Sequence, residues 1–351
     1  MEYSARERSI NYDFMRVLMS LFVICIHTSL PAYINDNRLL SNFISVFLFQ
    51  CNGIFFMISG KFNLCKKFEC KKDYANYYAN RFESILVPYG IVTCLLVLLE
   101  IIVSKQHCNL NGYIYQCIVA FFSTNASNHL WFICYLIGFL ISTPFLAKMV
   151  IAMKDDELKV LFAIGICWNI IAIYLTADLG VSFNISGWFL WGWIFVYFLG
   201  YFCDRIINDN NVKIIYCLGI TGFIISVLGK TYLDIFKYST DLSVGFIFFT
   251  MSCYLFLQRH IVINNKRNVF IPIVTYMARY SFVAYMLHYF IIHNITNKFV
   301  VSNEGIMRYI LFVLITFIIS YIASILVSNI IIKPMQKLLR LFWKFILGQC
   351  Q

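Results

Sequence analysis

The 351-residue chain is too apolar for a soluble protein. Hydrophobic residues make up 61% of it, aromatic residues 18% and charged residues only 13%, whereas soluble domains carry about 25% charged residues. A helix that crosses a bilayer needs about 20 residues, so the length leaves room for about ten spans. Composition therefore excludes a soluble enzyme and predicts an all-α fold, a polytopic membrane helix bundle.

The charge and the cysteines exclude further classes. A net charge of +11 is typical of nucleic-acid binding, but Lys and Arg follow the loops of one membrane face, so we expect no nucleic-acid partner. Most of the 13 cysteines lie in apolar runs, where Cys behaves as a small hydrophobic residue. Cys65 and Cys70 lack the spacing of a zinc site. We expect neither a disulfide framework nor a metal.

Apolar runs predict ten helices in chain order. They are placed at 13–33, 41–61, 84–103, 129–152, 159–177, 187–204, 213–229, 241–258, 272–296 and 307–332. The stretch 112–123 is too short to cross and is expected to be re-entrant or interfacial. Of the five prolines, Pro144 alone is expected to kink a helix, because the others fall at span ends.

Loop charges predict the orientation. With the N-terminus inside, cytoplasmic segments carry 20 Lys and Arg and the opposite loops 6, so the positive-inside rule places both termini in the cytoplasm. Asp13 and Arg16 interrupt the first apolar run, which argues against a cleavable signal peptide. Residues 1–334 are expected to form one membrane domain. Residues 335–351 are expected to be a basic amphipathic cytoplasmic tail, and the run KPMQKLLRLFWKFIL (333–347) is expected to lie on the inner leaflet.

Two ionisable residues lie within the first predicted span, where each is costly and often functional. Arg16 and His27 are eleven residues apart, which on a helix is about 20° from a shared face and a rise of about 16.5 Å. A cation at the cytoplasmic mouth and a base deep in the membrane suit a long substrate with an anionic head. Alternatively, Arg16 reaches the lipid headgroups of the inner leaflet, and His27 is a packing residue without a catalytic role.

Glu100 and His288 are expected at a depth similar to that of His27, about sixteen residues into their spans. Either could hydrogen-bond an imidazole nitrogen of His27, fix its tautomer and raise its basicity, as general-base catalysis requires. We therefore take His27, Glu100 and His288 as the candidate catalytic residues. For Glu100, a simple position at headgroup level remains open.

Six segments in order resemble the acyltransferase-3 family of integral membrane acyltransferases. The first is the helix with Asp13-x-x-Arg16-x10-His27, and the resemblance runs from about residue 8 to 334. The others are FFMISG (55–60), RFESILVPY (81–89), HLWFICYLIGFLISTPFL (129–146), YFLGYF (197–202) and SFVAYMLHYFII (281–292). One departure is Ser84, where the family commonly has a second arginine. The chain resembles the bare membrane domain, without an esterase-like companion.

The resemblance implies acyl transfer, usually of acetyl, from cytoplasmic acyl-CoA to a hydroxyl of a sugar. The expected partners are acetyl-CoA, a cell-envelope glycan or lipid-linked sugar, and membrane lipids; the expected location is the bacterial inner membrane. Arg16 would bind the CoA phosphates, with Arg81 and possible help from Lys61 and Arg279. His27 would act as general base or accept the acyl group itself.

The remaining motifs support smaller roles. The small pair Ser59 and Gly60 permits either a cofactor contact or close helix packing. His129 and Trp131 are candidate contacts of the acceptor, although interfacial polar and aromatic belts give the same pattern. A permease of a small solute such as an amino acid is the alternative function, since ten helices with buried charges could surround a translocation path. A glycan flippase or polymerase would not need the pairing of Arg16 with His27.

Overall fold

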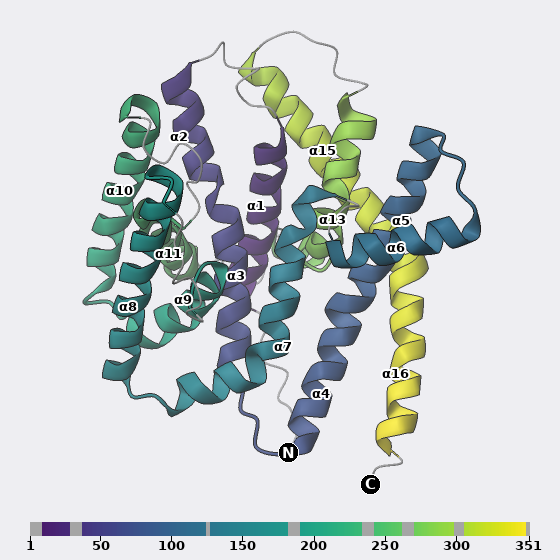
Figure 1. The fold of residues 1–351 in the computed structure, drawn as a ribbon, viewed down its shortest axis with the longest axis horizontal. Helices are drawn as coiled ribbons and strands as arrows, with labels where there is room; N and C mark the ends of the chain where they lie inside the picture. Colours follow the sequence, from purple (N-terminus) through teal and green to yellow (C-terminus); the bar gives the residue numbers. More distant parts are fainter. Residues whose placement is uncertain are drawn as a thin grey trace. The chain divides into compact units, whose positions relative to one another are not determined.

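The computed structural model describes residues 9–28, 37–123, 127–181, 190–233, 242–261, 270–297 and 305–348. This part of the chain contains helices and no strand, which confirms the predicted all-α class (Figure 1). The basic residues before Ser9, which entered the orientation count, lie outside the described residues. The cytoplasmic location of the termini stays a prediction.

The number of spans found is lower than the ten predicted. Within the described residues, seven helices are long and apolar enough to cross a membrane, or eight if the broken pair Phe270–Ala278 and Ser281–Thr296 counts as one span. The two remaining predicted spans correspond to Trp193–Ile206 and Val244–His260, whose described helices have 14 and 17 residues. Both are preceded by residues outside the described part. A count of ten therefore stays a prediction.

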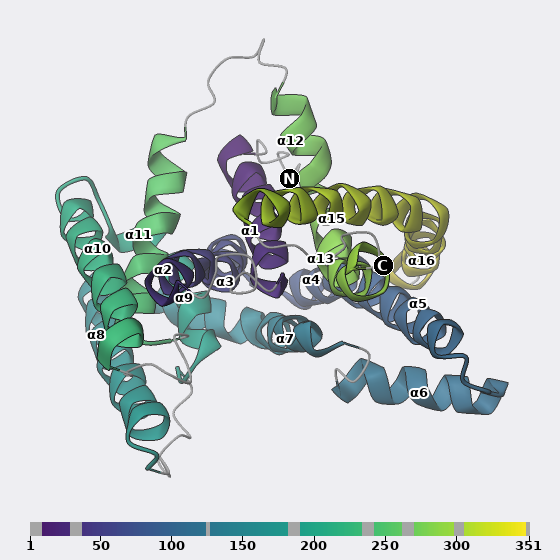
Figure 2. The same cartoon turned by 90° about the horizontal axis from the view of Figure 1, so that it is seen from above.

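Contacts divide the chain into two compact units, and the first comprises residues 1–65 and 149–279. Within it, α10 and α11 pack closely along each other, while α3 contacts α1, α9 and α11 (Figures 1 and 2). Its elements are α1 (Ile10–His27), α2 (Arg38–Leu48), α3 (Gln50–Leu64), α8 (Asp155–Ile173), η4 (Tyr174–Asp178), α9 (Trp193–Ile206), α10 (Val212–Leu228), η5 (Gly229–Leu233), α11 (Val244–His260) and α12 (Phe270–Ala278).

Two glycines fix the contact between α3 and α9. A Cβ atom on Gly60 would lie 1.7 Å from the Tyr197 carbonyl oxygen, and one on Gly200 would lie 1.8 Å from the Met57 carbonyl oxygen. Any side chain at either position would collide with the main chain of the other helix. Small residues allow this backbone approach between membrane helices, so the two glycines set the spacing of the unit's core.

The second unit comprises residues 66–148 and 280–351. In it α13 packs on α15 and α5, and α5 packs on α6, as Figures 1 and 2 show for α13 and α15. The 14-residue helix at Leu110–Ser123 is too short to span, as predicted for this stretch. The elements are α4 (Lys71–Arg81), η2 (Phe82–Leu86), α5 (Val87–Ser104), α6 (Leu110–Ser123), η3 (Asn128–Leu130), α7 (Trp131–Ala152), α13 (Ser281–Ile291), η6 (Ile292–Thr296), α15 (Ile306–Val327), η7 (Ser328–Ile332) and α16 (Lys333–Gly348).

Two helices continue through prolines that the sequence placed at span ends. Pro88 and Pro334 each follow a π-helical turn, η2 and η7, inside continuous helices that run over Lys71–Ser104 and Ile306–Trp343. A proline removes one N–H and crowds the preceding turn, and a π turn relieves both by changing the hydrogen-bond register. The third predicted span therefore begins earlier than residue 84, and no break separates the tail from the last span at residue 334.

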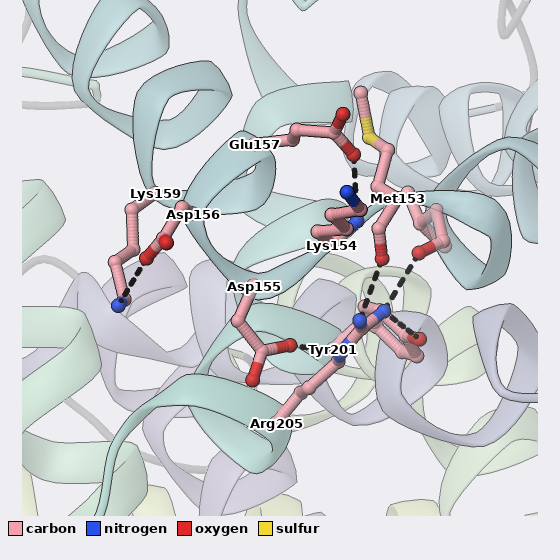
Figure 3. Close-up of polar contacts among 9 residues, drawn as sticks. Met153, Lys154, Asp155, Asp156, Glu157, Lys159, Tyr201 and Arg205 are labelled. Atoms are coloured by element: carbon pink, nitrogen blue, oxygen red, sulfur yellow. Dashed lines mark hydrogen bonds and ion pairs between the residues drawn. The ribbon is translucent and has the colours of Figure 1, made fainter.

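Arg205 of α9 ties the last turn of α7, whose residues 149–152 belong to the first unit, to the start of α8 (Figure 3). Its Nη1 donates to the Val150 carbonyl oxygen at 2.8 Å, its Nη2 to the Met153 carbonyl oxygen at 2.6 Å, and its Nε to Asp155 Oδ1 at 2.9 Å. Tyr201 OH accepts a further bond from Nη1 at 3.2 Å. The last carbonyls of a helix lack intrahelical donors, and a cation there also favours the helix dipole. Arg205 thus acts as a cap supplied by another helix.

Candidate functional site

The predicted pair on the first helix lies on one unbroken α-helix, α1, with His27 as its last residue. Arg16 Nη1 donates to Asp13 Oδ1 at 3.0 Å. Asp13 is fully buried, whereas the Arg16 side chain remains 32% exposed. The guanidinium also lies over the Phe62 ring, 5.7 Å from its centroid. Asp13 therefore orients Arg16, and His27, which is half-buried, lies about 16.5 Å further along the axis.

A cluster of four polar residues lies in the first unit near Arg16, since Tyr12 and Arg16 both contact the Phe62 ring; we call it the Lys61 cluster. It consists of Tyr12, Lys61, Asp204 and Gln258, from α1, α3, α9 and α11. Lys61 forms an ion pair with Asp204 and lies 5.1 Å from the Tyr12 ring centroid. Gln258 Nε2 donates to Tyr12 OH at 2.8 Å and to Asp204 Oδ1 at 3.1 Å. The cluster joins helix ends that the loop charges assigned to the cytoplasmic face.

Ser59 and Gly60 precede the Lys61 cluster on α3. Asn63 Nδ2 donates to the Ser59 carbonyl oxygen at 2.7 Å and lies 3.3 Å from the Ser59 hydroxyl. The contact of Gly60 with α9 accounts for the glycine by helix packing alone. Packing was one of the two interpretations of this pair, and a contact with the cofactor stays a prediction.

In the second unit the structure brings His129 and His288 together. Their ring centroids are 4.7 Å apart in an edge-on arrangement, and Tyr289 stacks on His129 at 5.2 Å. Both histidines are buried. The Tyr285 hydroxyl donates to the His129 carbonyl oxygen at 2.5 Å, which fastens η3 to α13. We call His129, His288, Tyr285 and Tyr289 the histidine cluster.

Hydrogen bonds determine the neutral tautomers of the two rings. His129 Nε2 lies 3.2 Å from the Met286 carbonyl oxygen, and because a carbonyl only accepts, Nε2 carries the proton. Nδ1 of the neutral ring then accepts from the Ser127 hydroxyl at 2.6 Å. His288 Nδ1 donates to the Tyr285 carbonyl oxygen, so the lone pair of the neutral His288 ring is on Nε2. His288 has the fixed ring orientation that a general base requires.

The other predicted residues are in different surroundings. Glu100 is exposed on α5, and its carboxylate forms no hydrogen bond or ion pair within the described residues, so it is not joined to the buried His288. Trp131 begins α7 and packs edge-on against Phe132 and Tyr135. Arg279 is exposed between α12 and α13. A role for these three residues stays a prediction.

Arg81, the last residue of α4, belongs to the second unit. Its guanidinium lies 5.3 Å from the Tyr77 ring centroid. The Ser84 hydroxyl, at the position where a second arginine was expected, donates to the Asn80 carbonyl oxygen at 2.6 Å within its own helix. In the described part of the chain, no group of three or more His, Cys, Asp or Glu residues is placed to hold a metal ion.

Sequence reasoning missed three members of the Lys61 cluster and the pairing of the two histidines. Tyr12, Asp204 and Gln258 each stand at a helix end, where a polar residue is ordinary, so only the fold shows that they meet. Asp204 carried the one usable signal, an acidic residue at the end of the predicted span 187–204. A role of His288 in orienting His27 stays a prediction, and within its own unit the histidine neighbour of His288 is His129.

The fold and these sites define a class of polytopic helical membrane proteins with oriented ionisable residues within their helices. The sequence profile described as an acyltransferase domain matches residues 9–325, nearly the whole chain. The chain therefore belongs to this acyltransferase family, which confirms the family resemblance. No curated protein and no solved structure matches the chain.

Proposed function

We propose that this membrane acyltransferase moves an acetyl group from cytoplasmic acetyl-CoA to a hydroxyl of a cell-envelope glycan or lipid-linked sugar in the bacterial inner membrane. The observation that carries the proposal is α1, which holds an oriented arginine and a histidine about 16.5 Å apart along one unbroken helix. CoA has the same order of groups, with phosphates at one end and the thioester at the other.

Arg16 is the proposed phosphate ligand. Arg16 pairs with Asp13, and Lys61 pairs with Asp204, so each cation is neutralised by a carboxylate. Binding of the CoA phosphates would therefore depend on directed hydrogen bonds more than on a net positive charge. A guanidinium has five N–H donors in a planar fork that matches phosphate oxygens, and Arg16 is one-third exposed. Lys61, held by Asp204, is the second proposed ligand.

His27 is the proposed base. In direct transfer its imidazole takes the proton of the acceptor hydroxyl while the hydroxyl oxygen attacks the thioester carbonyl. The C–S bond then breaks, and the departing CoA sulfur receives that proton from the imidazolium. Alternatively, the imidazole itself attacks the thioester and passes the acetyl group to the acceptor in a second step. Both routes yield the acetyl ester and free CoA, and both require His27.

We assign the histidine cluster to the acceptor. Both ring nitrogens of His129 bond to protein atoms, so His129 would position its neighbour and leave the acceptor contact to His288. His288 Nε2, the lone-pair nitrogen of the neutral ring, would accept a hydrogen bond from an acceptor hydroxyl. His288 is thereby the second candidate base.

The test supplies radiolabelled acetyl-CoA to membranes that contain the wild type, His27→Ala, His288→Ala or His107→Ala. His107 is an exposed loop residue and the matched control. We expect label in a glycan or lipid fraction for the wild type and His107→Ala, with a loss of about 10²–10⁴-fold for His27→Ala at equal protein level. A loss with His288→Ala alone would transfer the role of base to His288. Background label in every sample, with solute uptake that does not need acetyl-CoA, would favour the permease.

A further inference from the structure

Lys333 forms a polar cluster with Tyr280 and Asn329 in the second unit. Its Nζ donates to the Tyr280 hydroxyl at 2.9 Å and to Asn329 Oδ1 at 2.6 Å. The ammonium group lies over the Tyr280 ring, 5.0 Å from the centroid, and the Tyr280 hydroxyl donates to Asn329 Oδ1 at 3.4 Å. We call these three residues the Lys333 cluster.

A π-helical turn determines how this cluster is built. Asn329 lies within η7, and Lys333 follows η7 directly. A π turn contains one more residue than an α turn, so it rotates the residues after it by about 100° around the helix axis. Tyr280 is the buried N-cap of α13, and both α13 and η7 pack against α5. The cluster therefore joins the end of the last long helix to the start of α13.

The charge of Lys333 is not balanced by a carboxylate within the described residues. Arg16, Lys61 and Arg340 each form an ion pair with an Asp or a Glu. Both hydrogen-bond partners of Lys333 are neutral oxygens, one of a hydroxyl and one of an amide. Neutral partners orient the ammonium group but leave its full charge available to an anion.

Hydrogen-bond donors also remain available in the Lys333 cluster. An ammonium group has three N–H donors, and Lys333 uses two of them. The Asn329 amide accepts through Oδ1, and its Nδ2 has no partner within the described residues. Lys333 and Asn329 are both exposed, so a ligand can reach these donors. Two N–H donors beside one positive charge suit a phosphate group, which has several acceptor oxygens.

We propose that the Lys333 cluster binds a phosphate group, with the ammonium group of Lys333 as the charged ligand and Asn329 Nδ2 as a second donor. Lysine binds phosphate as a compact point charge, and the Tyr280 hydroxyl holds that charge in one position. Two molecules carry a phosphate to the membrane face of the basic loops, CoA and an anionic phospholipid. Binding of CoA here rests on the proposed acetyl transfer, whereas binding of a phospholipid does not.

The test measures both phosphate sources on the purified full chain. The first arm is equilibrium binding of radiolabelled CoA in a neutral detergent. If CoA supplies the phosphate, Lys333→Gln should weaken its binding about ten-fold, the effect of losing one hydrogen bond to a charged group. The second arm counts phosphatidylglycerol and phosphatidylcholine retained in native mass spectra. If a lipid supplies the phosphate, Lys333→Gln should abolish a preference of about five-fold for phosphatidylglycerol.

Lys337→Gln is the matched control, because it removes one exposed charge a turn further along α16 and should leave both arms unchanged. An effect of Lys337→Gln as large as that of Lys333→Gln would overturn the proposal, as would a Lys333→Gln variant that equals the wild type in both arms. If Lys333→Gln does not fold, Asn329→Ala removes the second donor, and its equality with the wild type in both arms overturns the proposal as well. A wild type that binds no CoA contradicts the proposed acetyl transfer, and the lipid arm alone then decides the Lys333 cluster.

Discussion

The ion pair of Asp13 and Arg16 leads to a prediction in which the two partners are unequal. Asp13 is fully buried and the Arg16 side chain is 32% exposed. Arg16→Gln leaves a buried carboxylate without its cation. Asp13→Asn leaves Arg16, whose guanidinium group can remain in contact with water and donate a hydrogen bond to the new amide oxygen. We therefore expect Arg16→Gln to destabilise the protein more than Asp13→Asn.

The geometry sets the magnitude. At an N–O distance of 3.0 Å and an effective dielectric constant of about 20, the Coulomb attraction is about 5.5 kcal/mol before the cost of desolvation. Breaking a buried pair by removing one partner costs about 3–5 kcal/mol, and the exposure of Arg16 reduces this to about 2–3 kcal/mol for Arg16→Gln. Asp13→Asn should cost about 1 kcal/mol, the price of one weakened hydrogen bond. The double variant should resemble Asp13→Asn, because it leaves no buried charge.

Thermal unfolding of the purified variants in one detergent tests the order of stabilities. We expect the melting temperature to fall in the order wild type, then Asp13→Asn and the double variant, then Arg16→Gln. The recovery of stability when Asp13→Asn is added to Arg16→Gln is the decisive feature. An additive double variant, or an Asp13→Asn less stable than Arg16→Gln, would refute the assignment of a buried, paired carboxylate at residue 13.

Two further predictions concern helix contacts. Gly60→Ala places a Cβ atom against a main-chain oxygen of α9 and should cost about 3 kcal/mol or more of stability, which gel filtration should show as loss of the monodisperse peak. Gly138→Ala is the control, because no atom lies within 4 Å of its Cβ, and it should behave as wild type. Equal behaviour of the two variants would contradict the close approach of α3 and α9. Arg205→Lys keeps the positive charge but loses the guanidinium group that donates to two main-chain carbonyls. Limited proteolysis at residues 153–155 should therefore become faster. An unchanged cleavage rate would contradict the capping role of Arg205.

The sequence predicts the helical class and most helix positions because lipid imposes a simple rule of about 20 apolar residues on each span. It predicts helix ends poorly wherever a polar or proline-containing segment continues a helix. The lysine-rich segment from Lys71 and the tail from Lys333 are both helical, because π turns before Pro88 and Pro334 accommodate the proline rings. Composition treats such segments as loops or separate tails, and only the backbone register shows their continuity.

The candidate site was predictable where it depends on one helix and unpredictable where it depends on tertiary contact. Eleven residues separate Arg16 from His27, so their relation follows from helix geometry once α1 is a single helix. His129 and His288 are 159 positions apart, and no periodicity relates them. Their approach depends on the packing of η3 against α13, which the Tyr285 hydroxyl fixes through a main-chain carbonyl. The pattern of side chains does not predict such a bond, because every residue has a main-chain carbonyl that could accept it.

Arg16 and Arg81 illustrate why residue type and predicted depth are insufficient to assign a ligand. Both are arginines near the expected cytoplasmic ends of spans, and the sequence assigned both to CoA phosphates. Arg16 is oriented by a buried carboxylate beside the Lys61 cluster, whereas Arg81 lines an apolar groove beside Trp343 and has no ion pair within the described residues. An arginine that already pairs with a carboxylate of the protein binds a ligand through the direction of its hydrogen bonds. An arginine without an ion pair also gains stability from a bound anion. The two arginines therefore offer different surroundings to an anion, and binding of the CoA phosphates by either of them stays a prediction.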